Sequence, residues 1–368
     1  MNLQRSVGVD GYRALGPTDA RLHEDALDGM RGVAALLVVL SHLSTARMHL
    51  IPGLDLKGVG KPGVYLFFVL SAFLLTRQIL GRERAALTDR ALWARYFARR
   101  FLRIFPLLAF VLVLSYALGR LFGLGLPFRI SGPELIPHLT LRAGKGVLWS
   151  IPPEFQYYFV LPAVGAAFVL TRGHEAIALG ACLLVIVFAS QLWPPSLAIA
   201  NAAYLGPYLP VFLLGSVAAL VHGQLVRAAA SARRRALYEG GALICGMAVG
   251  VTIPLVYRAL SGRPIPSNHF NDSLIFYGVV WSGFLVCTLL GSGWCRAALS
   301  TRAIRYFGLI SFSVYLWHMA VIRLVRNLSP FAAIPSAWLT LALILGVASA
   351  SYLLIERPFQ KLRIGGVH

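Results

Sequence analysis

Acidic residues are scarce in this sequence. Of its 368 residues, 14 are Asp or Glu, against 34 Lys and Arg, and charged residues of both signs make up only 13%. Soluble globular domains carry about 25% charged residues, so this composition excludes an ordinary soluble protein. The formal net charge of +20 would suggest nucleic-acid binding in a soluble chain. Here the basic residues stand in short segments between apolar runs, which membrane topology and anionic lipid explain, and no nucleic-acid partner is expected.

Cysteine is also rare, and its four copies lack the spacing of a metal site. All four lie in or beside apolar runs: Cys182, Cys245, Cys287 and Cys295. Free buried thiols are therefore expected in place of disulfides or zinc ligands. The sequence predicts neither a metal nor a permanently bound cofactor.

Long apolar runs dominate the rest of the chain, which is 58% hydrophobic with a mean hydropathy of +0.71. This predicts an all-α, polytopic integral membrane protein with about ten transmembrane helices. The expected spans are 31–50, 62–80, 103–123, 150–171, 176–193, 204–222, 239–257, 273–291, 304–326 and 336–355.

The ends of the chain are polar. Residues 1–26 carry charges of both signs without an apolar core, so they predict a loosely ordered cytoplasmic leader and no cleavable signal peptide. A transmembrane domain over 27–357 and a short cytoplasmic tail over 358–368 complete the expected organisation. Spans five to eight offer few polar side chains and are assigned scaffold roles.

The basic residues predict the orientation of the chain. Most of the 34 Lys and Arg residues fall on one side if the N-terminus is inside the cell, as cytoplasmic loops require. We therefore predict a protein of the cell (inner) membrane with both termini cytoplasmic. Arg323 and Arg326, near the outer end of the ninth span, oppose this pattern.

The first span, LDGMRGVAALLVVLSHLS over 27–44, holds two ionisable residues, Arg31 and His42. In a helix their separation is about three turns, so they lie on nearly the same face and about 16 Å apart. His42 would then stand near the middle of a hydrocarbon core about 30 Å thick. Ionisable groups at that depth usually face a polar cavity and are candidates for function. The alternatives are an interfacial anchor for Arg31 and a hydrogen-bonded packing residue for His42.

The second span carries one central polar residue, Ser71, for which packing is the favoured interpretation. A basic segment, 77–106, follows and ends in RRFLRIFP. Its Arg100 and Arg103 fall on one helical face. Such a pair is typical of a lipid-headgroup anchor, which the spacing alone favours, or of a clamp for phosphate groups.

Glu154 is the one acidic residue that lies past the first position of an expected span, in LWSIPPEFQYYFVLP over 148–162. Pro152 and Pro153 suit a helix start, so Glu154 should occupy the first helical turn, where the helix dipole favours a carboxylate. The predicted topology places it on the outer side. It serves either a functional site or a structural ion pair with a buried arginine.

The ninth span contains a polar stripe, because Ser311, Tyr315 and His318 follow one another at helical spacing in ISFSVYLWH. The stripe fits either contact between helices or the wall of a cavity.

Six of these stretches, taken in order, resemble the acyltransferase-3 family, the membrane-bound O-acyltransferases of surface glycans. They are LDGMRG…LSH, FFVLSAFLL, RRFLRIFP, LWSIPPEFQYYF, ISFSVYLWH and ERPF. The resemblance implies transfer of an acyl group, commonly acetyl, from cytoplasmic acyl-CoA to a hydroxyl of a carbohydrate or glycosylated acceptor. It also ties activity to a small set of residues, here Arg31 with His42, Arg100 with Arg103, and Glu154.

The chemistry assigns these residues roles. Histidine is well matched to removing a hydroxyl proton at neutral pH, so His42 is the expected general base, with Glu154 close by to orient it. A nucleophilic His42 that carries the acyl group remains an alternative. The arginines Arg31, Arg100 and Arg103 would hold the phosphates of acyl-CoA, and Ser71, Ser311, Tyr315 and His318 are candidate cavity-lining residues. A proton-coupled transporter or flippase is the second function considered, since such proteins also place ionisable residues in the membrane.

Overall fold

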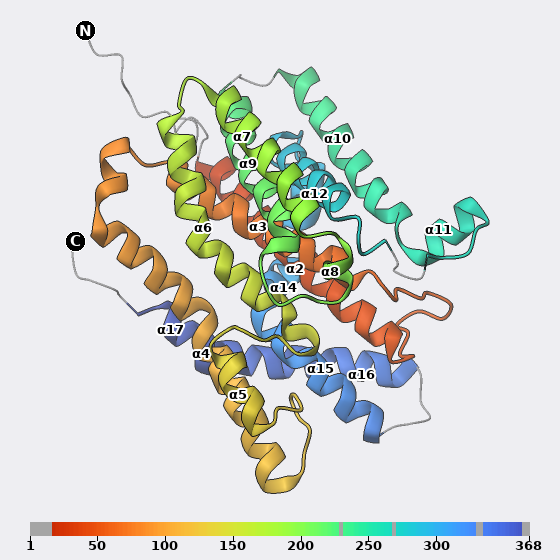
Figure 1. The fold of residues 1–368 in the computed structure, drawn as a ribbon. Coiled ribbons are helices and arrows are strands. Elements are labelled where there is room, and N and C mark those ends of the chain that lie inside the picture. The colour runs from red at the N-terminus through yellow and green to blue at the C-terminus, as the bar shows by residue number, and fades with distance from the viewer. Residues whose placement is uncertain (1–16, 228–230, 267–269, 329–333, 363–368) are drawn as a thin grey trace.

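A computed structural model describes residues 17–227, 231–266, 270–328 and 334–362. Within these residues the regular structure is helical, without strands, as predicted (Figure 1). The helices are α2 (Pro17–Thr45), α3 (Gly60–Leu80), α4 (Arg90–Phe122), α5 (Gly132–Leu139), α6 (Ile151–Leu170), α7 (Glu175–Leu192), α8 (Ser196–Ile199), α9 (Leu209–Arg227), α10 (Ala232–Val251), α11 (Pro254–Ser261), α12 (Leu274–Leu290), α13 (Trp294–Leu299), α14 (Arg302–Leu309), α15 (Ser311–Leu328), α16 (Ile334–Ser351) and α17 (Arg357–Gln360). Short 3₁₀ turns (Arg84–Thr88, Gly146–Ser150 and Gly206–Tyr208) and one π-helical turn, η4 (Tyr352–Glu356), join them.

Six of the described helices are long and apolar enough to cross a membrane, and eight spans result if each of two bent pairs counts as one. The expected count of about ten is therefore not confirmed, although every predicted span falls on a helix. Two of those helices explain the difference. α12 has only 17 residues, and α6 is diluted by prolines and by polar residues of its first two turns.

The predicted ninth span is two helices. α14 and α15 meet at Ile310 with a bend of 80°, so α15 leaves the direction of α14 and runs beside α16. α4 differs in another way, because it begins at Arg90 and continues through Pro106, which brings Arg100 and Arg103 into a single long helix. α2 begins at Pro17, within the predicted leader, whose first 16 residues lie outside the described part of the chain.

Glycines let α2 and α14 touch backbone to backbone. A Cβ atom added at Gly32 would collide with the carbonyl oxygen of Ile304, and one at Gly308 with that of Asp28. Only glycine allows this approach, because any side chain would separate the two helices. The contact brings Arg31 close to the bend between α14 and α15.

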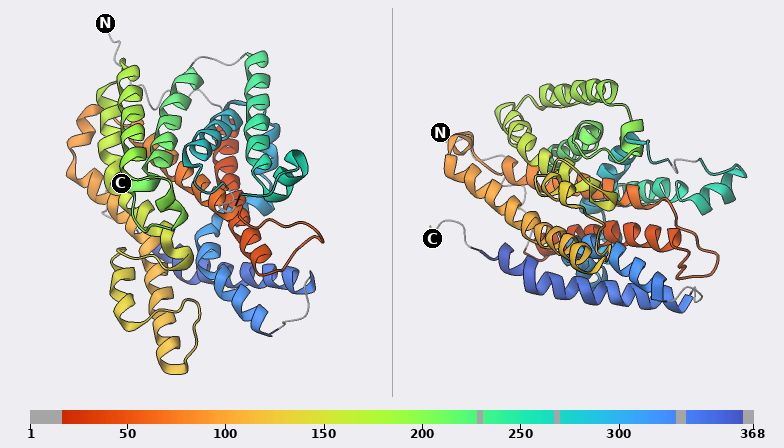
Figure 2. Two further views of the ribbon diagram at one scale, coloured as in Figure 1. Left: turned by 45° about the vertical axis from the view of Figure 1, so that its right-hand side comes forward. Right: turned by 60° about the horizontal axis from the view of Figure 1, so that its bottom comes forward.

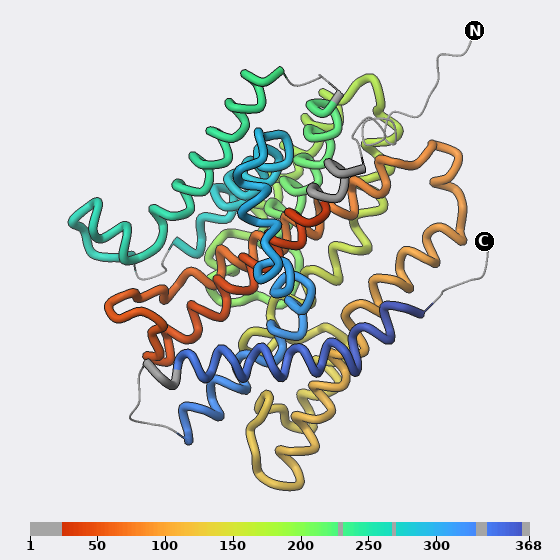
Figure 3. Tube along the Cα trace, turned by 180° about the vertical axis from the view of Figure 1, so that it is seen from behind, coloured from red at the N-terminus to blue at the C-terminus, as the bar shows by residue number. Residues whose placement is uncertain are grey.

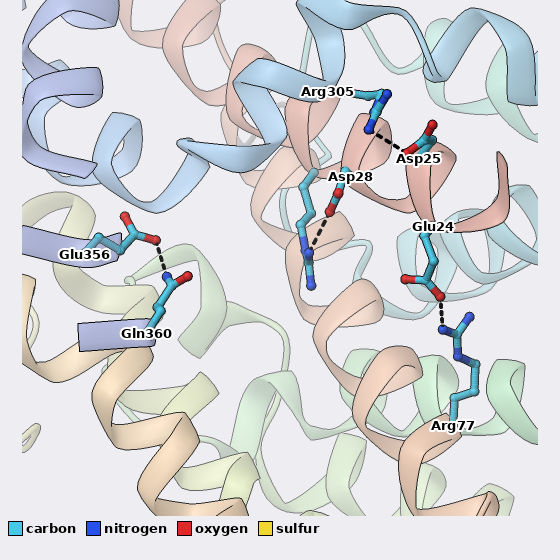
Figure 4. A network of polar contacts seen from close by, with 8 residues as sticks. Glu24, Asp25, Asp28, Arg77, Arg305, Glu356 and Gln360 are labelled. Carbon is cyan, nitrogen blue, oxygen red and sulfur yellow. Dashed lines mark hydrogen bonds and ion pairs between the residues drawn. The ribbon is translucent and has the colours of Figure 1, made fainter. Parts of the chain in front are cut away.

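Ion pairs gather several helix ends at one end of the bundle. Glu24 of α2 pairs with Arg77 at the end of α3, and Asp25 of α2 pairs with Arg305 of α14 at 2.6 Å (Figure 4). These pairs bring Glu24 and Asp25 of α2, the end of α3 and the first half of α14 to the same end of the bundle.

α3 forms the centre of the bundle, because it packs against α2, α6, α9 and α12. Its side chains in the central turns are nearly all buried. α4 packs along η4 and α17 on one flank, while α10 and α11 lie at the far side of the molecule (Figure 2). From behind, α16 runs across the near face with α15 beside it (Figure 3). All four cysteines are free thiols, as predicted, but only Cys182 is buried and the other three are half-buried.

Candidate functional site

The first of two cavities at the centre of the bundle gathers three arginines from two helices. Arg31 comes from α2, and Arg100 and Arg103 come from α4. The cavity contains about 760 Å³ of empty space, including its open mouth. The spacing of three residues that predicted a shared face for Arg100 and Arg103 is thus realised in the structure.

This first cavity carries excess positive charge. Arg31 is paired with Asp28 of its own helix at 3.0 Å. The Arg100 Nε atom is buried and has no hydrogen-bond partner among the described residues. Glu154 is the single acidic residue among the described residues that line the cavity. Guanidinium groups that converge with unused donors fit an anion such as a phosphate.

Glu154 lies in the first turn of α6, as predicted, and faces this cavity. One carboxylate oxygen accepts hydrogen bonds from the Ser71 hydroxyl at 2.9 Å and from the Tyr158 hydroxyl at 2.7 Å. Ser71 therefore contributes to the site in place of the packing role favoured from sequence. Tyr158, one helical turn after Glu154, is one of the hydrogen-bonding residues that the sequence sets around this carboxylate, although the sequence alone did not mark it as a site residue.

The second cavity lies farther along α2 and contains His42. It has about 1030 Å³ of empty space, including its opening. Lys61 of α3, Trp149, Asn271 and Arg323 of α15 line it together with His42. The predicted separation of Arg31 and His42 along one helix therefore places them in two different cavities.

Tyr315 belongs to the walls of both cavities, as does Val64. Its side chain is only 7% exposed. Its hydroxyl donates to the Val147 carbonyl and accepts from the Ser150 hydroxyl, with 2.8 Å between the two oxygens. Tyr315 thus stands where the two cavities meet, anchored to the turn that precedes α6.

One face of α15 connects the cavities. Ser311 lines the first cavity, Tyr315 lines both, and Met319 and Arg323 line the second. Residues four apart share a helical face, and the distance from Ser311 to Arg323 along the axis is about 18 Å. Two of the three residues of the predicted polar stripe, Ser311 and Tyr315, are therefore cavity-lining residues.

His318, the third residue of the stripe, is fully buried and packs against His42 instead of lining a cavity. The two ring centroids are 5.1 Å apart. The His318 Nδ1 atom donates to the backbone carbonyls of Tyr315 (2.7 Å) and Val314 (3.2 Å). The ring proton is thereby assigned to Nδ1, and the buried Nε2 atom has no partner in the described structure.

The structure does not bring Glu154 to His42. Glu154 faces the arginines of the first cavity, whereas His42 faces the second, with Tyr315 between the two spaces. The direct His–Glu pair that was expected from the sequence is not formed. The sequence predicts how far along its own helix each residue lies, but not which helix packs beside it. His318 of α15 occupies the place beside His42 that was expected for Glu154.

Two other carboxylates are buried more deeply than Glu154, which is half-buried. Glu356, in the π-helical turn, is 3% exposed. It accepts hydrogen bonds from the Ser313 hydroxyl and the Gln360 amide, each 2.8 Å long, and the second of these is drawn in Figure 4. Glu239 of α10 is 7% exposed and accepts from the backbone nitrogen of Cys295 at 2.6 Å. Both lie near the ends of predicted spans, where uncertain boundaries concealed them.

Comparison with known proteins identifies the fold family. Residues 24–356 match the family described as an acyltransferase domain, which confirms the resemblance drawn from the motifs. The chain is 23% identical to a peptidoglycan O-acetyltransferase of Listeria monocytogenes, with 93% of this chain and 56% of that protein covered. No solved structure matches.

Two further relatives carry provisional names. A membrane-bound transacylase of Komagataeibacter xylinus is 29% identical, over 90% of this chain and 81% of that protein. A peptidoglycan O-acetyltransferase of Bacillus subtilis is 26% identical, over 91% of this chain and 54% of that protein. The chain thus spans about half the length of two of these three relatives.

Proposed function

The chain belongs to the acyltransferase family, and on that premise we propose that it is a membrane O-acyltransferase that moves an acyl group, commonly acetyl, from acyl-CoA to a hydroxyl of a carbohydrate. The observation that carries the proposal is the pair of cavities that meet at Tyr315. One is rich in arginine and the other contains a histidine, which are the groups that an anionic thioester donor and a hydroxyl acceptor require.

The first cavity is the proposed donor site. Arg31, Arg100 and Arg103 bind the phosphates of acyl-CoA through charge-assisted hydrogen bonds. The flexible pantetheine arm then extends past Tyr315 toward His42, so that the thioester reaches the second cavity. Glu154 balances part of the arginine charge and holds the hydroxyls of Ser71 and Tyr158. In this proposal Glu154 acts on the donor side, beside the arginines, and not on the outer side where the sequence-based topology had placed it, and it does not touch His42.

The second cavity is the proposed site of chemistry. His42 removes the proton of the acceptor hydroxyl as that oxygen attacks the thioester carbonyl carbon. The carbon–sulfur bond then breaks, and the departing sulfur takes the proton back from the His42 imidazolium to leave as CoA. The ring of His318 packs against the ring of His42 and supports it. The proton of His318 is held on Nδ1, so its buried Nε2 atom is a hydrogen-bond acceptor without a partner among the described residues. A nucleophilic His42 that carries the acyl group predicts an isolable acyl-enzyme, which general base catalysis does not.

The direct test is release of free CoA thiol by purified protein from acetyl-CoA. Addition of an acceptor glycan should increase thiol release and should yield an acylated glycan of the expected mass. A proton-coupled transporter or flippase, the other function considered, would release no thiol under any of these conditions.

We also propose that both termini are cytoplasmic, which places the arginine cavity toward the cytoplasmic supply of acyl-CoA. The proposal is supported by the distribution of basic residues and by the shared location of the ends joined by Glu24–Arg77 and Asp25–Arg305. Reporter fusions after Arg90 and after Arg235 should both read inside, and either one reading outside would contradict the orientation.

A further inference from the structure

The second cavity has an unbalanced charge. Three cationic side chains line it, Lys57, Lys61 and Arg323, and its described lining contains neither Asp nor Glu. None of the three forms an ion pair with an acidic side chain in the described part of the chain. A cavity with this lining attracts anions and disfavours cationic ligands.

Lys61 shows how the charge is held in place. Its ammonium group donates to the backbone carbonyls of Ala198 at 2.6 Å and Ile199 at 3.0 Å, and it lies 5.7 Å from the centre of the Trp149 ring. These partners are neutral, so they fix the position of the ammonium group without cancelling its charge.

The position of Arg323 explains why this basic residue departs from the predicted charge pattern of the membrane topology. It lies near the end of α15 that the predicted topology places outside, where basic residues are disfavoured. Its place in the cavity wall, on the same helical face as Tyr315, supplies a reason. Arg326, three residues later, is exposed and does not line the cavity.

The neutral lining of the cavity suits a sugar. Trp149 lines the cavity, and its ring packs against Tyr208 at 5.0 Å between ring centres. The side-chain oxygen of Asn271 is buried without a hydrogen-bond partner in the described structure. An unused buried acceptor in a cavity that is also lined by an aromatic residue is suited to a ligand that presents hydroxyl donors. Asn201 adds a second amide to the same wall.

We infer that the second cavity binds an acceptor sugar that carries an anionic group, a carboxylate or a phosphate ester, and that Arg323 and Lys61 recognise this group. The inference rests on the proposed function, because His42 in the same cavity makes its ligand the acceptor. The juxtaposition of Arg323, Lys61 and Trp149 around His42 carries it.

Three probes that differ only at carbon 6 of the sugar test this inference. They are p-nitrophenyl β-glucoside, the corresponding glucuronide with a carboxylate, and the corresponding glucoside 6-phosphate. Equilibrium binding to the purified protein and acyl transfer from acetyl-CoA are measured separately for each probe. At least one anionic probe should bind about tenfold or more tightly than the neutral glucoside, as expected for a charge-assisted hydrogen bond. Which one it is distinguishes a carboxylate ligand from a phosphate ester.

Variants then test which side chains cause the preference for an anionic probe. Arg323→Gln and Lys61→Gln should each reduce it, whereas Arg326→Gln, on the same helix but outside the cavity, should leave it intact. Higher salt should weaken the preference in the wild type. Acetyl-CoA binding by each variant verifies that it is folded.

Several results would overturn the inference: equal binding of all three probes, binding of none, or a preference that survives in both Arg323→Gln and Lys61→Gln. A clear preference in binding without thiol release or transfer to any probe would instead contradict the proposed function. The two failures are therefore distinguishable.

Discussion

Tyr315 and Ser150 are joined by a hydrogen bond of 2.8 Å at the place where the arginine cavity meets the histidine cavity. The bond ties α15 to the turn that precedes α6, and therefore to the helix that carries Glu154. In the proposed mechanism the pantetheine arm passes this side chain on its way from the first cavity to the second.

We predict that Tyr315→Ala uncouples thioester cleavage from transfer. Removing the side chain widens the passage between the cavities, so that the pantetheine arm no longer fills it and more water reaches the thioester at His42. The ratio of acceptor-independent CoA release to acyl transfer should rise several-fold. Tyr315→Phe, which keeps the ring, should show a smaller rise, and Tyr306→Phe, a change at an exposed residue of α14, should show none. An unchanged ratio in Tyr315→Ala would remove Tyr315 from the path.

Arg100→Ala and Arg103→Ala should weaken donor binding more than they slow chemistry. Phosphate contacts distant from the thioester act as uniform binding, so they affect KM and leave kcat nearly unchanged. The KM for acetyl-CoA should rise by about tenfold or more for each variant, the range of a hydrogen bond to a charged group. Arg99→Ala, an exposed neighbour outside the cavity, is the matched control. A fall in kcat at constant KM would assign the arginines another role.

Glu154→Gln should be milder than His42→Ala. The amide oxygen of glutamine can still accept from Ser71 and Tyr158, so the change removes charge and keeps most of the local hydrogen bonding. Steady-state kinetics at matched protein levels should show a smaller loss of kcat than for His42→Ala. A loss as large as that of His42→Ala would place Glu154 in the chemical step and would favour the direct pairing expected from sequence.

Gly308→Ala should destabilise the protein without touching either cavity. The added methyl group would press against the backbone of α2 at Asp28, and backbone cannot move aside as a flexible side chain can. Overpacking of this kind typically costs about 1–3 kcal/mol. Thermal unfolding in detergent should show the loss, while Gly346→Ala, where nothing lies within 4 Å, should behave like the wild type.

Features that depend on one helix at a time were predictable from the sequence. The helical character of the chain, the start of α6 at its prolines and the shared face of Arg100 and Arg103 follow from local spacing and capping rules. The start of α2 and the bend at Ile310 were not predicted, because apolar runs do not reveal where a helix begins or changes direction.

Features that depend on the packing of several helices were not predictable. From the sequence, Glu154 and His42 are both expected to face a polar interior. Only the arrangement of α2, α6 and α15 decides that they face different cavities. The role of Ser71 was not predictable for the same reason. A single hydroxyl in an apolar helix favours a packing role, and only the structure shows the Glu154 carboxylate 2.9 Å away.

The most direct test of the account is the acyl-transfer activity of His42→Ala. General base catalysis contributes about 10²–10⁴ in rate, so kcat should fall by at least that lower factor while acetyl-CoA binding, measured separately at equilibrium, stays close to that of the wild type. Arg31 and the other arginines of the first cavity are untouched by this change, which is why donor binding should survive. Near wild-type turnover by His42→Ala would contradict the proposed mechanism.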